Sequence, residues 1–157
     1  MAAKIWVVDD EDAVREALEA MMRQLNYETR TFAKGEDALS AFESDKPDVV
    51  VTDVRMPGMS GLELTRRLLE LDPDLIVMIL TGYPSIPDAV EAIKGGATDF
   101  LAKPCRIEEL RMRMNRALEN RELEARFKRT RFMAWAVILS LPVWFVLGMV
   151  LMHFLSR

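Results

Sequence analysis

The sequence predicts a doubly wound α/β protein with a five-stranded parallel sheet, an extended last helix and a C-terminal transmembrane helix. Short apolar runs alternate with helical patterns from residue 4 to residue 120, which is typical of a parallel sheet covered by helices on both faces. A run of 24 residues without Asp, Glu, Lys or Arg follows at 132–155. The predicted domains are therefore a globular domain at 1–120, a basic helical linker at 121–131 and a transmembrane helix at 132–155.

The strand predictions depend on short runs rich in β-branched residues. The clearest is Val49-Val50-Val51-Thr52, which follows Pro47-Asp48. Pro57-Gly58, a few residues after this run, prevents the strand from continuing. An apolar run without alternation is typical of a strand buried on both faces. The five expected strands are residues 4–8, 27–32, 49–52, 75–80 and 99–102.

Helical periodicity fills the intervals between these strands. Ser60 and Glu63 form a capping box, and Ser85 precedes a Pro in the first turn of the next helix. The residues expected on the buried faces are Val14, Leu18, Met21 and Leu25 in the first helix, Ala38, Leu39 and Phe42 in the second, Leu64, Leu68 and Leu71 in the third, Ala89, Val90 and Ile93 in the fourth, and Leu110, Met114 and Leu118 in the fifth.

Charge divides the chain into an acidic part and a basic part. Residues 1–104 hold 11 Lys and Arg against 20 Asp and Glu, whereas residues 105–131 hold 9 against 5. An acidic domain argues against nucleic acid as its main partner, because phosphate backbones require a positive surface. The single cysteine, Cys105, excludes an intrachain disulfide and suits a reducing cytoplasm. We interpret it as a small buried hydrophobe, with a reactive thiol as the alternative.

Polar residues follow four of the five predicted strands. Asp9 and Asp10 end the first strand, Asp53 the third, Thr81 the fourth and Lys103 the fifth. Because ligands bind at the carboxyl ends of parallel strands, these residues are expected to form one site. Taken singly, Asp53 could be a turn former, Lys103 a solvated lysine and Thr81 an ordinary strand residue; their convergence favours a site.

Three neighbouring carboxylates repel one another unless a cation compensates them. Oxygen ligands beside a phosphoryl group suit Mg²⁺. Asp is an established nucleophile for forming aspartyl phosphates. The sequence therefore predicts phosphoryl transfer to Asp53, with Lys103 and Thr81 binding phosphoryl oxygens.

Residues 4–120 resemble a response-regulator receiver domain, closest in character to the nitrogen-regulation class. The resemblance is carried by Trp6-Val7-Val8-Asp9-Asp10-Glu11, Thr52-Asp53-Val54-Arg55-Met56-Pro57-Gly58-Met59-Ser60-Gly61, Leu80-Thr81-Gly82-Tyr83 and Gly96-Ala97-Thr98-Asp99-Phe100-Leu101-Ala102-Lys103-Pro104. It implies a flavodoxin-like sheet with strand order 2-1-3-4-5.

The resemblance also implies roles for individual residues. Asp53 would be the phosphoacceptor, and Mg²⁺ would be held by Asp9 (largely through water), Asp10, Asp53 and the main-chain carbonyl of Arg55. Thr81 and Lys103 would bind the phosphoryl group, and Thr81 and Phe100 would form the switch, although Phe100 could be a simple core residue. Arg55 and Tyr83 would tune the lifetime of the acyl phosphate.

The expected function is a membrane-tethered, phosphorylation-dependent binding switch in a two-component phosphorelay, without a DNA-binding output. A sensor histidine kinase or another phosphohistidine protein would be the donor, and a target protein would bind the last strands and helices. The protein would catalyse only its own phosphorylation and dephosphorylation. The alternatives are a phosphate sink without a downstream partner and a phosphorylation-independent scaffold.

The C-terminal part leaves further alternatives open. The helical pattern over 107–131 suits either a coiled-coil homodimer or a solvated helix. Basic residues flank the segment 132–155 on its N-terminal side, so the positive-inside rule predicts a single-pass protein of the inner membrane with a cytoplasmic receiver. The same basic residues suit anionic lipid headgroups. The alternative is an amphipathic or buried helix of a soluble protein.

Overall fold

The computed structural model describes residues 3–127 and residue 152. Strands and helices alternate along this part of the chain, as the sequence predicts. The elements are β1 (Lys4–Val8), α1 (Asp12–Gln24), β2 (Glu28–Phe32), α2 (Gly35–Phe42), β3 (Val49–Thr52), α3 (Gly61–Leu71), β4 (Ile76–Thr81), α4 (Ile86–Lys94) and β5 (Asp99–Ala102). A further helix begins at residue 107 and continues through residue 127.

The five strands form one parallel sheet in the order β2-β1-β3-β4-β5, which confirms the predicted topology. In the centre of the sheet, Val7 of β1 pairs with Val51 of β3, and Val51 pairs with Met78 of β4. β3 and β4 are buried along their whole length. This burial explains why they are apolar runs without alternation.

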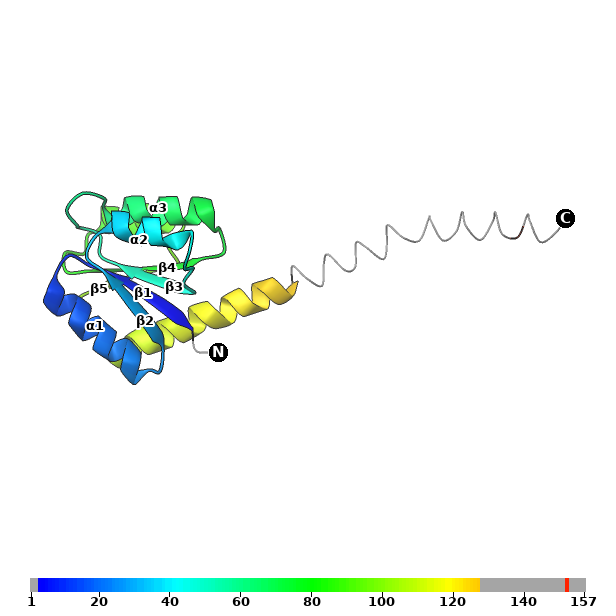
Figure 1. Ribbon diagram of the computed structural model, residues 1–157, viewed down its shortest axis with the longest axis horizontal. Helices are drawn as coiled ribbons and strands as arrows, with labels where there is room; N and C mark the ends of the chain where they lie inside the picture. The colour runs from blue at the N-terminus through cyan, green and yellow to red at the C-terminus, as the bar shows by residue number, and fades with distance from the viewer. Residues whose placement is uncertain (1–2, 128–151, 153–157) are drawn as a thin grey trace. The chain divides into compact units, whose positions relative to one another are not determined.

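Helices cover both faces of the sheet, and Figure 1 shows α2 and α3 on one side and α1 on the other. Alternate strand residues face the two sides, so two large core clusters form. One cluster contains Val7, Val51 and Met78 of the sheet with Leu18 and Met22 of α1 and Leu110, Met114 and Ala117 of the last helix. The other contains Trp6, Val50 and Val77 with Ala38 and Phe42 of α2 and Leu64 and Leu68 of α3.

The two predicted helix starts are confirmed. The Ser60 hydroxyl accepts a hydrogen bond from the main-chain N–H of Glu63 at 3.2 Å, and the Ser85 hydroxyl accepts one from Asp88 at 3.1 Å. Each bond satisfies one of the main-chain donors that a helix leaves free at its first turn.

Three of the residues expected on buried helix faces are exposed instead. Leu71 is 51% exposed at the end of α3, and Val90 and Ile93 of α4 are 46% and 53% exposed. α4 is buried through Ala92, which packs with Ile79 and Ala97 in a small cluster. A small residue brings the helix close to the sheet, and this orientation turns the longer apolar side chains of α4 outward.

The chain divides into two compact units, Met1–Leu118 and Glu119–Arg157. The predicted transmembrane segment at 132–155 lies outside the described residues, apart from residue 152. In the part of the chain that the structure describes, no helix has the length and hydrophobicity needed to cross a membrane.

Candidate functional site

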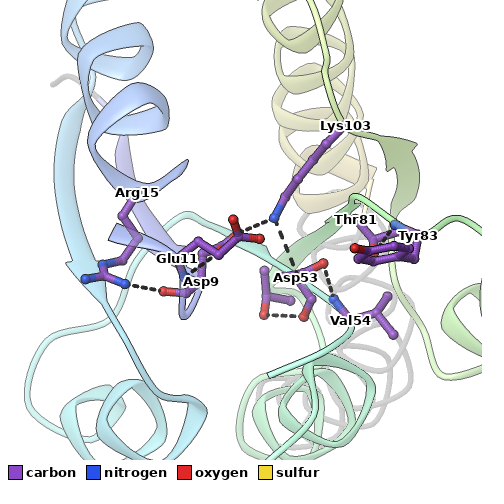
Figure 2. Close-up of polar contacts among 9 residues, drawn as sticks. Asp9, Glu11, Arg15, Asp53, Val54, Thr81, Tyr83 and Lys103 are labelled. Atoms are coloured by element: carbon purple, nitrogen blue, oxygen red, sulfur yellow. Dashed lines mark hydrogen bonds and ion pairs between the residues drawn. The ribbon is translucent and has the colours of Figure 1, made fainter. Parts of the chain in front are cut away.

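The polar residues that the sequence places at strand ends lie together at the carboxyl edge of the sheet. Asp9 and Asp10 follow β1 directly, Asp53 follows β3, and Thr81 is the last residue of β4. Lys103 follows β5, on the far side of β4. Figure 2 shows the Lys103 side chain reaching back across this edge toward Asp9 and Asp53.

The three carboxylates form a compact cluster. One oxygen from each of Asp9, Asp10 and Asp53 lies within 4.8 Å of the others. Asp9 and Asp53 are 1% and 6% exposed, whereas Asp10 is exposed to solvent. An all-oxygen donor set with one solvent-facing side suits Mg²⁺, which keeps several water ligands. The residues present therefore fit a magnesium ion.

Main-chain donors fix the orientation of the two buried carboxylates. The Oδ1 atom of Asp53 accepts a hydrogen bond from the N–H of Val54 at 2.8 Å, and Oδ1 of Asp9 accepts one from the N–H of Glu11 at 3.0 Å. Each bond engages Oδ1, and in both residues the other oxygen, Oδ2, faces the Lys103 ammonium.

Lys103 supplies the positive charge of the site. Its Nζ atom forms an ion pair with Oδ2 of Asp9 and lies 3.6 Å from Oδ2 of Asp53. Its main-chain N–H donates to the carbonyl of Thr81 at 2.8 Å, which fixes the lysine to β4. A buried carboxylate is costly without a cation or hydrogen-bond donors, so Lys103 compensates the two buried aspartates.

Thr81 and the rim of the site come from the end of β4. Thr81 is fully buried, and its hydroxyl accepts a hydrogen bond from the main-chain N–H of Tyr83 at 3.3 Å, which leaves the hydroxyl proton for donation. Tyr83 is 70% exposed, and the guanidinium carbon of Arg55 lies 5.4 Å from the centre of its ring. We call this contact the Arg55–Tyr83 stack; it joins the loops that follow β3 and β4.

Phe100 and Cys105 lie near the site but are not part of its polar cluster. Phe100 is half-buried against the small cluster that contains Val54, Ile79 and Ala92. Cys105 is half-buried against the core between the sheet and α1. Burial, together with the nearby Glu109 carboxylate, raises the pKa of the Cys105 thiol above its usual value. A protonated thiol favours the interpretation of Cys105 as a small hydrophobe over that of a reactive group.

Several contacts at the site were not predicted from the sequence. The Arg15 Nη1 atom donates to the carbonyl of Asp9 at 2.6 Å, and the side chain also pairs with Asp12. An arginine in the first turns of a helix that follows an acidic cluster was an available signal for this contact. The N–H donors of Glu11 and Val54 left no signal, because main-chain groups are the same at every position.

Comparisons with known proteins agree with this geometry. A family model described as "Response regulator receiver domain" matches residues 5–115. The chain is 37% identical over 142 residues to the C4-dicarboxylate transport transcriptional regulatory protein DctD of Rhizobium meliloti, covering 90% of this chain and 31% of that protein. It is 38% identical over 116 residues to the DNA-binding transcriptional regulator NtrC of Salmonella typhimurium, covering 74% of this chain and 25% of that protein.

A solved structure is similar over the same region. The crystal structure of NtrX from Brucella abortus has a TM-score of 0.77 and 34% sequence identity, covering 83% of this chain and 30% of that chain. The relatives thus include regulators of the nitrogen-regulation class, in agreement with the resemblance found in the sequence. The chain spans about a third or less of the length of these proteins.

Proposed function

Because the chain belongs to the response regulator receiver family, we propose that it accepts a phosphoryl group on Asp53 from a phosphohistidine protein and that this event controls a binding surface. The observation that carries the proposal is the cluster of three carboxylate oxygens within 4.8 Å, with the Lys103 ammonium 3.6 Å from Asp53. Phosphoryl transfer requires positioning of the nucleophile and neutralisation of the phosphoryl oxygens. This cluster supplies both.

In the proposed reaction, Oδ2 of Asp53 attacks the phosphorus atom of the donor. A P–O bond to Asp53 forms as the P–N bond to the donor imidazole breaks, and the imidazole nitrogen keeps the electron pair and takes up a proton. Lys103 offsets the charge of the phosphoryl oxygens, and the Thr81 hydroxyl donates a hydrogen bond to one of them. Asp9, Asp10, Asp53 and the main-chain carbonyl of Arg55 would hold Mg²⁺, which supplies further charge neutralisation.

The experiment is phosphorylation of the full-length chain by a small acyl phosphate. Labelled phosphoryl groups are expected on the wild type in the presence of Mg²⁺, and hydroxylamine should release them because it cleaves acyl phosphates. Asp53→Asn should incorporate no label. Incorporation into Asp53→Asn at the wild-type rate would contradict the proposed acceptor.

We favour a binding switch over a phosphate sink because of an exposed apolar surface on α4. Ile86, Val90 and Ile93 are 82%, 46% and 53% exposed and lie three and four residues apart, so they share one face of the helix. We call this face the α4 ridge. An exposed apolar face suits a protein partner. Phosphorylation would act on it through Thr81, at the start of the loop that leads to α4, and through Phe100, which packs in the same cluster as Ala92 of α4.

The lifetime of the acyl phosphate separates the two functions. A switch must stay phosphorylated long enough to bind its target, whereas a sink must hydrolyse the acyl phosphate quickly and release inorganic phosphate. We expect slow decay and a phosphorylation-dependent change in the environment of the α4 ridge. Rapid decay with no change at α4 would favour the sink.

We further propose that the segment 132–155 anchors the protein in the inner membrane with the receiver on the cytoplasmic side. Support comes from its 24 residues without Asp, Glu, Lys or Arg and from the basic residues Arg126, Lys128, Arg129 and Arg131 before it. Alkaline-wash fractionation of the full-length chain beside a truncation at Arg131 tests this proposal. The full-length chain should remain in the membrane pellet and the truncation should be soluble; recovery of both in the supernatant would contradict the anchor.

A further inference from the structure

Glu36, in the first turn of α2, contacts the loop that follows Asp53. Its Oε1 atom accepts a hydrogen bond from the main-chain N–H of Met59 at 2.8 Å. A Cβ atom added to Gly58 would lie 2.5 Å from the same oxygen, so the carboxylate fits closely against the main chain. Gly58 also has a φ of +79°, a conformation that favours glycine. A side chain outside the phosphorylation site therefore holds residues 58 and 59.

The loop that Glu36 holds carries Arg55, whose main-chain carbonyl is the proposed ligand to Mg²⁺. The base of the loop is closed by a hydrogen bond from the N–H of Gly61 to the carbonyl of Val54 at 3.0 Å. Met56 and Met59 are buried in the core beside α2, whereas Arg55 is exposed. The main chain thus fixes the base of the loop. Contacts with α2 fix the rest of it, and one of them is the hydrogen bond from the Met59 N–H to the charged Glu36 carboxylate.

We propose that Glu36 is a positioning residue for the magnesium site: by holding the Met59 N–H, it fixes the loop that presents the Arg55 carbonyl. The inference rests on the proposed function, in which that carbonyl binds Mg²⁺. Magnesium demands near-ideal octahedral geometry, so a ligand on a loose loop binds it poorly. Residues that orient metal ligands typically change metal affinity by 10-fold to 100-fold when they are replaced.

The Glu36 carboxylate is suited to this task because it is ionised at neutral pH. Hydrogen bonds from its own main-chain N–H and from that of Met59 lower the pKa of Glu36 below its usual value. Hydrogen bonds to an ionised acceptor are about twice as strong as those between neutral groups. The contact therefore restrains the loop under the conditions in which the receiver works.

Two substitutions separate the reach of Glu36 from its charge. Glu36→Asp keeps the charge but shortens the side chain by one methylene, so the carboxylate no longer reaches the Met59 N–H. Glu36→Gln keeps the length and an oxygen acceptor but removes the charge. Asp37→Asn is the matched control, since it removes one exposed charge from the same turn of α2, and within residues 3–127 Asp37 has no hydrogen bond to the loop.

The experiment is calorimetric titration of the full-length variants with magnesium chloride. We expect Glu36→Asp to bind Mg²⁺ about 10-fold more weakly than the wild type. Glu36→Gln, which keeps a weaker hydrogen bond to a neutral acceptor, should bind Mg²⁺ more weakly than Asp37→Asn but more tightly than Glu36→Asp. Amide exchange of Met59 in the absence of Mg²⁺ should be fastest in Glu36→Asp, intermediate in Glu36→Gln and slowest in the wild type and Asp37→Asn. Faster exchange with a loss of affinity supports positioning.

Two outcomes would overturn the inference. In the first, Glu36→Asp binds Mg²⁺ with wild-type affinity; in the second, Glu36→Gln loses as much affinity as Glu36→Asp. An Asp10→Asn variant distinguishes these outcomes from a failure of the proposed function. Wild-type affinity in Asp10→Asn would contradict the metal site itself, whereas a loss there with full affinity in Glu36→Asp would remove only the role of Glu36.

Discussion

Gly61, the first residue of α3, lies so close to Asp53 that an alanine there should displace this proposed phosphoacceptor. An added Cβ atom would lie 1.8 Å from the carbonyl oxygen of Asp53 and 2.8 Å from its carbonyl carbon. An ordinary Cβ contact begins at 3.4 Å, so the two segments must separate by about 1.6 Å. Because the obstacle is main chain, no side-chain rotation relieves it.

We expect Gly61→Ala to lower the free energy of unfolding by about 3 kcal/mol, the upper end of the usual cost of overpacking. For a domain of this size, that loss lowers the midpoint of thermal unfolding by about 12 °C. Circular dichroism measures the transition, and labelling with an acyl phosphate measures the accompanying loss of phosphorylation at Asp53.

The matched control is Gly82→Ala, at the other side of the site. An added Cβ atom at Gly82 would meet nothing within 4 Å, so we expect a change in stability of less than about 0.5 kcal/mol. If Gly61→Ala were as stable as the wild type, or if Gly82→Ala lost as much stability, close packing of the main chain would not explain the glycine at position 61.

Three further predictions test other parts of the structure. Ile93→Asp should change the midpoint of thermal unfolding by less than about 2 °C because Ile93 is exposed. Ala92→Asp buries an unpaired charge and should lower the free energy of unfolding by about 4 kcal/mol or more. Equal losses of stability in the two variants, measured by thermal unfolding, would contradict the orientation of α4. Arg55→Ala and Tyr83→Ala should each speed hydrolysis of the acyl phosphate by about 2-fold to 5-fold, because each removes an exposed cation–π contact of about 0.5–1 kcal/mol. In the double variant the acyl phosphate should decay no faster than in either single variant. Unchanged decay in both single variants would refute a role for the Arg55–Tyr83 stack. Hydrogen bonds from Lys4 and Arg30 lower the pKa of Asp45 below its unfolded value, so the stabilising effect of Asp45 is present above about pH 4 and is lost as the pH falls through the folded pKa. In denaturant unfolding, Asp45→Asn should therefore be less stable than the wild type at neutral pH and approach its stability in acid. A difference in stability that stays constant with pH would contradict this assignment.

The alternation of apolar runs and helical patterns was sufficient to predict a parallel sheet, and the residues that follow its strands predicted the site; the strand order came from the resemblance to receiver domains. A parallel sheet brings the carboxyl ends of its strands to one edge, so Asp9, Asp53, Thr81 and Lys103 could be expected together without any knowledge of side-chain contacts. The helix starts at Ser60 and Ser85 were equally accessible, since a cap depends on residues three positions apart.

Other features depend on which surface of an element meets the rest of the protein. Periodicity predicted Val90 and Ile93 on the buried face of α4, and this prediction was wrong. A pattern of apolar residues does not say whether their face is covered, and contact through Ala92 leaves both side chains in solvent. In α1, Met22 is fully buried and Met21 only partly, a difference set by the rotation of the helix. Glu36 acts on the main chain of Met59, which is 23 residues away in the sequence, so no spacing could indicate this contact. Arg15 lies only six residues after Asp9, and its place in the helix that follows the acidic cluster was an available signal.

Chemical mapping of the modified residue tests most directly whether Asp53 receives the phosphoryl group. Borohydride reduces an aspartyl phosphate to homoserine, which peptide sequencing by mass spectrometry detects. After reaction of the full-length chain with an acyl phosphate and Mg²⁺, we expect homoserine at position 53, where Oδ2 faces Lys103 across 3.6 Å. Homoserine at position 9 or 10 with none at position 53, or a phosphoryl group on a hydroxyl residue, would contradict this expectation.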